Sequence, residues 1–174
     1  MSLLSAALVR PRALAAAALL LAAAVVSPSH AAAQDAPKKP ILEAVSALGE
    51  YSLFLEALKA TGLADKIAAG GTWTVYAPND AAFARLNPDT LAALKADKDR
   101  LTRVLSHHVM STKYTGMDMM NAPIYSKVPT FAGDSMVIYH DKGGIKVDYK
   151  LVKVVDIEAT DGVIHTVREI ILKP

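Results

Sequence analysis

Two kinds of hydrophobic spacing divide the chain, and the spacing over residues 41–109 is mostly helical. Ile41, Val45 and Leu48 follow one another at intervals of four and three residues, which places their side chains on one face of a helix. A second stripe begins at Leu53 and ends at Gly62, a residue that readily terminates helices. This half of the chain therefore predicts helices that each bury one side.

One strand interrupts these helices. Residues 72–76 are β-branched or aromatic, which predicts a strand, and Pro78 ends it because proline lacks the N–H of a ladder hydrogen bond. Residues that cap or open helices then mark three further helix starts: Asn79 or Asp80 before a short helix with Phe83, Asn87-Pro88, and Asp97 or Asp99.

Residues 113–174 alternate in the manner of strands. Ile145 and Val147 alternate with charged residues, and a strand over 135–139 precedes them across a Gly-containing hairpin at 141–144. The next apolar run slips by one position at Val154-Val155, which predicts a β-bulge.

The end of the chain continues this pattern. Asp161-Gly162 predicts a tight turn, and apolar runs at 163–167 and 170–172 predict strands after it. Helices first and strands later imply a single α+β domain.

The N-terminal 33 residues have the order of a secretory signal peptide. Arg10 and Arg12 precede an unbroken run of Ala, Leu and Val over residues 13–26, and small residues at 29–33 offer a cleavage site. The apolar run is shorter than the roughly 20 residues of a membrane-spanning helix, which argues against an anchor. We therefore expect a signal peptide over 1–33, a mobile polar lead over 34–37, and a domain over 38–174 without a transmembrane segment, in the periplasm or secreted.

Charge and cysteine content narrow the function further. Removal of residues 1–33 takes away two arginines and no acidic residue, so 19 basic residues fall to 17 and match the 17 acidic ones. A balanced charge argues against nucleic acid and against anionic lipid as partners. The chain has no cysteine, so no disulfide framework supports an exported fold.

Three segments in order resemble the signatures of the fasciclin I domain. The first, 74–83, reads Thr-Val-Tyr-Ala-Pro-Asn-Asp-Ala-Ala-Phe; the second, 105–109, matches the family's Tyr-His segment but has His107 where Tyr is usual. The third, 160–167, is similar to the C-terminal signature, with Asp161 in place of Asn.

The resemblance covers about residues 38–174 and implies a wedge of β-strands flanked by several helices, with the helices mainly in the N-terminal half. It also implies an adhesion or ligand-binding role outside the cytoplasm, no catalytic activity and no cofactor. Seven residues carry the implied structural motif: Thr74, Ala77, Pro78, Phe83, His108, Gly162 and His165.

His107 and His108 are adjacent, and histidine is a common metal ligand. His108 shares an apolar stripe with Leu105, which favours a buried histidine bonded to backbone that fixes helix to sheet. His107 is expected on a solvated face, or in part of the packing of the missing Tyr. Thioether sulfurs suit Cu(I), but the spacing here matches no closed coordination pattern, so no metal ligand is assigned. Four methionines lie near these histidines: Met110, Met117, Met119 and Met120.

Enzymatic motifs are missing from the sequence. It has no Gly-x-Ser-x-Gly elbow, no cysteine nucleophile and no glycine-rich phosphate loop before a helix. Ser106 and His107 are adjacent and do not face each other on a helix. We therefore expect no catalytic residues.

Two surfaces are candidates for binding. Asp156-Ile157 resembles the Asp-Ile pair in the integrin-binding segment of animal fasciclin domains, although Val154-Val155 replaces the expected Glu-Pro; the alternative is one solvent-facing Asp at a strand edge. Aromatic and Met side chains in a loop-rich stretch offer a groove for an apolar ligand, or simply cover the core edge. The groove candidates are Tyr114, Met117, Met120, Tyr125 and Phe131.

Three hypotheses for function follow from these observations. The first is an adhesion or protein-interaction module that engages a matrix, cell-surface or periplasmic protein. The second is a carrier of an apolar small molecule, such as a carotenoid, which some fasciclin proteins bind, or another lipid. The third, with the weakest support, is a periplasmic copper-binding protein.

Overall fold

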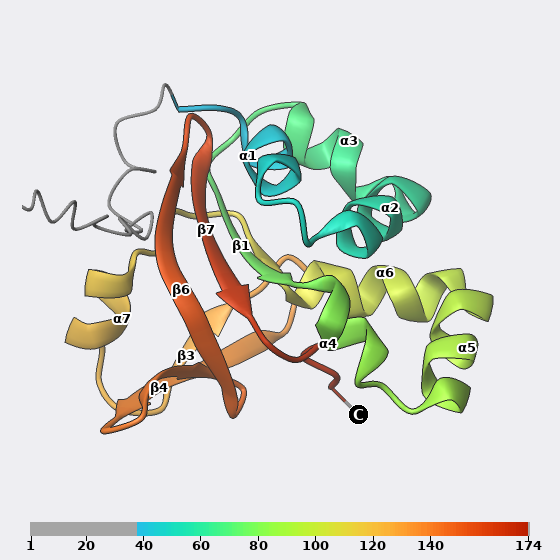
Figure 1. The fold of residues 1–174 in the computed structure, drawn as a ribbon. Helices are drawn as coiled ribbons and strands as arrows, with labels where there is room; N and C mark the ends of the chain where they lie inside the picture. The colour runs from blue at the N-terminus through green and yellow to red at the C-terminus, as the bar shows by residue number, and fades with distance from the viewer. Residues whose placement is uncertain (1–37, 174) are drawn as a thin grey trace, which may run out of the picture. The chain divides into compact units, whose positions relative to one another are not determined.

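The computed structural model describes residues 38–173, which form seven helices and seven strands in an α+β arrangement (Figure 1). The helices are α1 (Ile41–Ala47), α2 (Ser52–Thr61), α3 (Leu63–Ala68), α4 (Asp80–Ala84), α5 (Pro88–Ala96), α6 (Lys98–His107) and α7 (Gly116–Asn121). The strands are β1 (Trp73–Pro78), β2 (Val109–Met110), β3 (Ser126–Pro129), β4 (Ser135–Asp141), β5 (Gly144–Val147), β6 (Lys150–Ala159) and β7 (Gly162–Val167). The predicted signal peptide and lead lie outside the described residues.

All seven strands form one sheet in the order β2-β1-β7-β6-β5-β4-β3. β1 and β7 pair in parallel, whereas every other pair is antiparallel. The long strand β6 joins two parts of the sheet, since it pairs with β7 and with β5, and the sheet curls almost into a barrel (Figure 1).

Two hydrophobic clusters lie on opposite sides of β1 and β7. Helices α1–α6 cover one side, where Val75 and Ile164 pack against Phe54 and other helix residues (Figure 1). On the other side Tyr76 and Val167 pack against buried residues of α7, β4 and β5. Both faces of these strands therefore lie in the core, and all six residues of each strand are buried.

The predicted helix starts are confirmed at the cap residues. The Asn79 side chain accepts a hydrogen bond from the Ala82 N–H, and the Asp97 side chain accepts one from Arg100. Pro88 occupies the first turn of α5, as its missing N–H favours. Gly62 ends α2 with a φ of 74°, but the chain then continues directly into α3, a helix that the pattern did not indicate.

The predicted turns and bulge of the second half are also confirmed. Asp141 pairs with Gly144 across the β4–β5 hairpin, and Ala159 pairs with Gly162 across the β6–β7 turn. The register of β6 against β7 shifts between Val152 and Ile157, where the bulge was expected.

Two expectations for this half are wrong. Residues 170–172 form no strand, because the Ile171 N–H donates to a histidine ring and not to a neighbouring strand. Residues 116–121 form a helix inside the stretch expected to hold strands only. The Thr115 hydroxyl and Asp118 carboxylate form a capping box that stabilises this helix.

Candidate functional site

The first signature segment holds a neighbouring loop against β1. The Thr74 hydroxyl donates to the Thr112 carbonyl oxygen at 2.6 Å and accepts from the Tyr114 N–H at 2.8 Å. Thr74, Ala77 and Pro78 are all buried, so these residues support the fold and offer no surface for a partner.

The third signature places Gly162 directly against the backbone of β1. A side-chain carbon at Gly162 would lie 1.9 Å from the Trp73 carbonyl oxygen, which no side chain can occupy. The Trp73 N–H in turn donates to the Asp161 carbonyl oxygen at 2.9 Å. Only glycine permits this close approach, which is why the parallel pair β1–β7 can form here.

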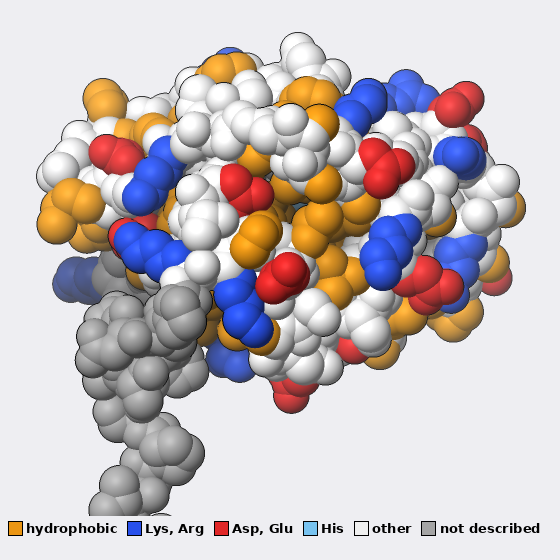
Figure 2. Space-filling model, turned by 90° about the horizontal axis from the view of Figure 1, so that it is seen from above, with side chains coloured by type: hydrophobic (Ala, Val, Ile, Leu, Met, Phe, Trp, Pro, Cys, Tyr) orange, Lys and Arg blue, Asp and Glu red, His pale blue; other side chains and the backbone are white. Residues whose placement is uncertain are grey.

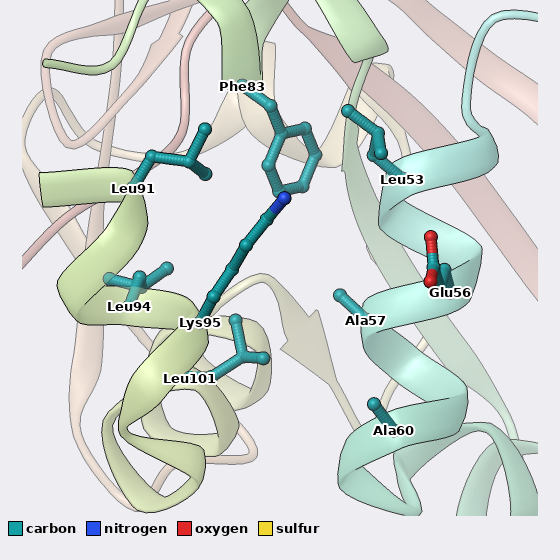
Figure 3. Close-up of a pocket in the computed structure, with 9 residues that line it drawn as sticks. All are labelled: Leu53, Glu56, Ala57, Ala60, Phe83, Leu91, Leu94, Lys95 and Leu101. Carbon is teal, nitrogen blue, oxygen red and sulfur yellow. The ribbon is translucent and has the colours of Figure 1, made fainter. Parts of the chain in front are cut away.

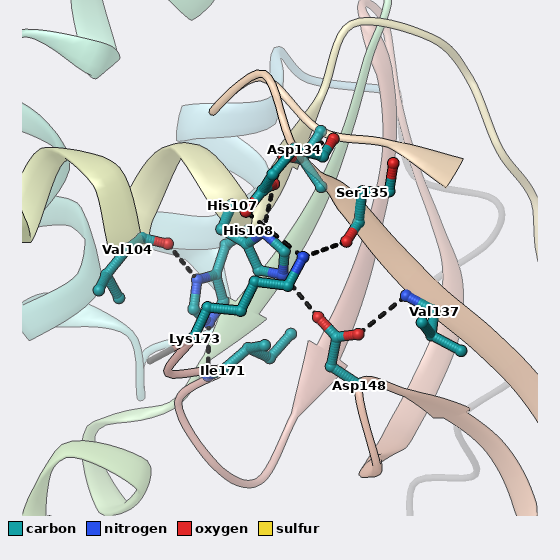
Figure 4. Close-up of polar contacts among 10 residues, drawn as sticks. Val104, His107, His108, Asp134, Ser135, Val137, Asp148, Ile171 and Lys173 are labelled. Atoms are coloured by element: carbon teal, nitrogen blue, oxygen red, sulfur yellow. Dashed lines mark hydrogen bonds and ion pairs between the residues drawn. The ribbon is translucent and has the colours of Figure 1, made fainter. Parts of the chain in front are cut away.

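His108 is fully buried, as predicted, but its ring joins α6 to the C-terminal segment after β7 and not to a strand of the sheet (Figure 4). Its Nδ1–H donates to the Val104 carbonyl oxygen at 2.7 Å, and its Nε2 accepts from the Ile171 N–H at 3.0 Å. This arrangement requires the neutral ring. Burial lowers the pKa of His108 from 6.5 to about 4, although the bond to Val104 opposes the shift.

His165 on β7 makes a similar pair of bonds. Its Nε2–H donates to the Tyr114 carbonyl oxygen at 2.8 Å, and its Nδ1 accepts from the Asp156 N–H at 3.1 Å. Burial lowers the pKa of His165, so the ring stays neutral. The residue connects β7, the bulge in β6 and the loop before α7.

His107 differs from the other two histidines and is not on a solvated face, because only 2% of its surface is exposed. Its Nδ1 lies 2.7 Å from Asp134 Oδ1, and its Nε2 lies 2.6 Å from Asp148 Oδ2 (Figure 4). The Lys173 ammonium group lies 3.4 Å from the other oxygen of the Asp134 carboxylate. An ionised carboxylate only accepts hydrogen bonds, so each ring nitrogen is placed to donate to one of the two carboxylates.

The two carboxylates are held in the ionised form. Burial alone would raise the pKa of Asp148, but hydrogen bonds from His107 and from the Val137 N–H outweigh it and lower the pKa. Hydrogen bonds from Thr130 and His107 likewise outweigh burial and lower the pKa of Asp134. The cluster therefore ties α6 to the β4–β5 region by charged hydrogen bonds.

The histidines and methionines do not converge on a metal site. Both ring nitrogens of His107 and of His108 already have partners. Met110 and Met119 are buried in the cluster around Tyr76, whereas Met117 and Met120 face solvent. Among residues 38–173, no three His, Cys, Asp or Glu side chains are grouped so that they could hold a metal ion.

Asp156 holds α7 against the sheet. Its Oδ1 accepts from the Gly116 N–H at 2.8 Å, its backbone has a φ of 58°, and its side chain is half-buried. The carboxylate is thus occupied inside the chain, and Ile157 packs against the helix-side core. Neither side chain of the Asp-Ile pair is simply presented to solvent.

The five groove candidates separate in space. Phe131 packs edge-to-face on Trp73 in the helix-side cluster, with ring centroids 5.4 Å apart, and Tyr114 packs on the opposite cluster. Met117, Met120 and Tyr125 are exposed, by 67%, 49% and 59%. The sequence did not show this division because loop residues have no fixed spacing from which their side-chain direction follows.

The exposed apolar side chains gather beside α7. Seven large hydrophobic residues among 38–173 are exposed, and all but Leu48 lie on α7, just after it, or on the adjoining strands and turns. Met117, Met120, Ile124 and Val155 form a surface that we call the α7 patch; Val155 lies 3.3 Å from the side-chain position at Gly116. Seen from above, hydrophobic side chains reach the surface on the side where α7 lies and also across the middle of this face, and charged side chains of both signs are scattered over the whole view (Figure 2).

A separate apolar cavity lies among the helices. It has a volume of about 220 Å³ and opens between α2 and α5, with Phe83 at its end and Lys95 crossing its mouth (Figure 3). None of the predicted groove residues lines it. Its lining consists of Leu53, Glu56, Ala57, Ala60, Phe83, Leu91, Leu94, Lys95 and Leu101.

Within residues 38–173, no helix has both the length and the apolar character that crossing a membrane requires.

Comparison with known proteins agrees with this arrangement. The family model described as the fasciclin domain matches residues 49–173. Protein sll1483 of Synechocystis is 32% identical over 77% of this chain and 73% of its own length, and the uncharacterized protein sll1735 of the same organism is 34% identical over 70% and 89%. Human periostin is 24% identical over 76% of this chain, which spans 16% of periostin.

A solved structure shares the fold. The FAS1 domain pair of the insect cell adhesion molecule Fasciclin I matches 67% of this chain and 43% of its own, with a TM-score of 0.56 and 18% identity. The α+β fold, in which a glycine permits the parallel pairing of β1 with β7, is thus that of a fasciclin-type domain. The chain belongs to the fasciclin domain family.

Proposed function

We propose that this chain is an exported adhesion module that binds a protein at the cell surface or in the matrix through the α7 patch. The observation that carries the proposal is the concentration of exposed apolar side chains at α7. Exposed apolar surface that forms one patch is typical of interaction sites, whereas scattered exposed residues are not. Methionine side chains suit such a surface because they adapt to the shape of a partner.

The family supports this function. One matched structure is of an insect cell adhesion molecule, and periostin and the transforming growth factor-beta-induced protein ig-h3 are more distant relatives. Location outside the cytoplasm is part of the proposal and follows from the signal-peptide pattern of residues 1–33.

Adhesion of coated beads tests the proposal. Beads carrying residues 34–174 should bind cells of the source organism, and Met117→Ser, Met120→Ser and Ile124→Ser together should weaken binding at least about tenfold, or about 1.4 kcal/mol. Leu48→Ser is the matched control, because Leu48 is exposed but lies away from the patch. Equal loss in the control, or unchanged binding in the triple variant, would contradict the assignment.

The Asp-Ile pair can be tested in the same assay. Asp156→Asn keeps an acceptor for the Gly116 N–H and tolerates a positive φ, so α7 should stay in place. If adhesion depends on the Asp156 charge, beads carrying this variant should no longer bind cells. If the α7 patch alone binds, adhesion should be unchanged.

The cavity between α2 and α5 favours a second function, the binding of a small apolar molecule. Its volume of about 220 Å³ lies below the roughly 300–1,000 Å³ of pockets for drug-sized ligands, which favours a single ring or short chain over a long polyene. Native mass spectrometry of protein from its own host should then show one small organic molecule, and Ala57→Leu should remove it by filling the cavity. A measured mass equal to that of the protein alone would count against the binding of a small molecule.

A further inference from the structure

A second surface lies on the outer side of strands β3–β6, away from the helices (Figure 1). The register places Lys127 opposite Val137, Tyr139 opposite Lys146, and Lys146 opposite Leu151. Side chains alternate along each strand, so these residues share one face, while Met136, Ile138 and Val147 point into the core.

Three tyrosine rings contact one another in a row on this surface. The centroids of Tyr125 and Tyr139 are 5.1 Å apart, and those of Tyr139 and Tyr149 are 5.6 Å apart. Tyr125 and Tyr149 remain 59% and 71% exposed although they contact Tyr139. We call these three residues the tyrosine face.

The backbone holds the two exposed tyrosines in unfavourable conformations. Tyr125 has a φ of 64° and Tyr149 a φ of 67°, values that bulky side chains rarely adopt. Asp148 and Tyr149 form the two-residue turn between Val147 and Lys150, with φ values of 43° and 67°, where asparagine and glycine are usual. Such strain is found where a side chain serves a ligand, and here it presents a ring to solvent.

Lysines also lie on the strands and the turn of this surface: Lys127 on β3, Lys142 between β4 and β5, and Lys153 on β6. Lys127, Lys142 and Lys153 are exposed and form no ion pair with any of residues 38–173. Lys146 lies over the Tyr139 ring, 5.5 Å from its centroid, and pairs with Asp141. The Asp148 carboxylate beside Tyr149 is bound to His107 and does not offset these charges.

We propose that the tyrosine face and its lysines bind an acidic polysaccharide outside the cytoplasm. The C–H faces of sugar rings pack on the exposed rings of Tyr125 and Tyr149, whose hydroxyl groups stay hydrated. The sugar carboxylates pair with Lys127, Lys142 and Lys153, and the release of their counterions favours binding. The open surface accepts an extended polymer, and a setting outside the cytoplasm favours a polysaccharide over a nucleic acid.

This inference goes beyond the proposed protein contact and shares with it only the location outside the cytoplasm. The two surfaces use different side chains, so each can fail without the other. Together they would let one domain connect a protein to a polysaccharide matrix.

Affinity electrophoresis of residues 34–174 in native gels tests the inference. Alginate, a polymer of uronic acids, should retard the protein, neutral dextran should not, and added salt should weaken the retardation. Tyr149→Gly should lower the affinity roughly tenfold without lowering the melting temperature, because glycine suits the positive φ. Lys127→Gln should weaken binding and reduce its salt dependence, while Lys98→Gln on α6 should change neither.

Three results would overturn the inference. They are equal retardation by dextran, unchanged alginate binding in Tyr149→Gly, and tighter binding of an oligothymidine than of alginate. The triple α7 variant separates the two surfaces, since it should lose cell adhesion but keep its retardation by alginate.

Discussion

His108 is the residue whose buried bonds lead to the clearest pH dependence. Its neutral ring links Val104 to Ile171, so His108→Ala should lower the free energy of unfolding by about 1–3 kcal/mol at neutral pH. The folded pKa of about 4 lies below the ordinary 6.5, so the unfolded chain takes up a proton first as the pH falls. The contribution is therefore complete above pH 6.5, and about 3 kcal/mol of stability is lost between there and pH 4.

Urea unfolding at several pH values between 7 and 4 measures this effect. The gap in stability between the wild type and His108→Ala should narrow as the pH falls. His140→Ala is the matched control, because it also removes a histidine but one that is not buried. A gap that stays constant with pH would refute the neutral buried ring.

His107 should behave differently, because its partners are charged. His107→Tyr restores the residue usual in the family, but one hydroxyl can donate to only one of Asp134 and Asp148. We expect a loss of about 1–3 kcal/mol at pH 7, since one of these partly buried carboxylates loses its hydrogen bond to the ring but keeps its other partners. The pKa of each carboxyl group is lowered from 3.8, so this stabilisation is present above that pH and is lost as the pH falls below it.

The difference between wild type and His107→Tyr should therefore be largest near neutral pH and shrink in acid. Chemical denaturation of both proteins at pH 7 and near pH 3 checks this. Equal stability at pH 7 would show that the charged bonds contribute nothing.

The burial of His108 could be predicted from the sequence, whereas the burial of His107 could not. His108 lies on the apolar stripe of its helix, so its burial follows from local spacing. Helical spacing places His107 on the same side of the helix as Arg103, which indicates an exposed position. Its two partners lie 27 and 41 residues away along the chain. Contacts between residues so far apart leave no periodic pattern in the sequence. The only indication of a special role was that His107 stands where the family usually has Tyr.

Among the elements, the β1–β7 pair depends most on a single residue. Gly162→Ala would place a methyl group 1.9 Å from the Trp73 carbonyl oxygen and 2.9 Å from Ile41 Cδ1. We expect a loss of about 3 kcal/mol, because backbone and core must both shift. Calorimetry should show a lower melting temperature for this variant and a much smaller change for Gly143→Ala, whose added methyl group would meet side chains only, the nearest being Asp141 at 3.1 Å, and no backbone. Similar melting temperatures would contradict the close packing.

Helix α7 shows why element type was harder to predict after residue 113. It has only six residues, too few for a clear helical period, and its methionines fit several structures. The Thr115–Asp118 spacing was a usable sign of a capping box. Helix α3 escaped notice because it follows Gly62 directly, without a connecting loop.

At the scale of the whole domain, fold class was predictable but topology was not. Helical spacing followed by strand spacing implies α+β, and the hairpin turns indicate which neighbours pair. The parallel contact of β1 with β7 joins distant segments through a glycine, and no local pattern reports it. The family resemblance supplied the fold that periodicity alone left open.

The export prediction also belongs to the whole molecule. The first contacts of the described domain come from Lys38, whose ammonium group pairs with Glu158, and from Lys39, whose carbonyl accepts from the Thr160 N–H. The Ile41 N–H then donates to Asp161. Cleavage after Ala33 therefore removes none of the contacts described here. Protein recovered outside the cytoplasm should have the mass of residues 34–174 and, without cysteine, a melting temperature that reductants leave unchanged. Recovery of the full 174 residues from the cytoplasm would contradict export. The protein could then not meet the surface proteins and polysaccharide that it is proposed to bind.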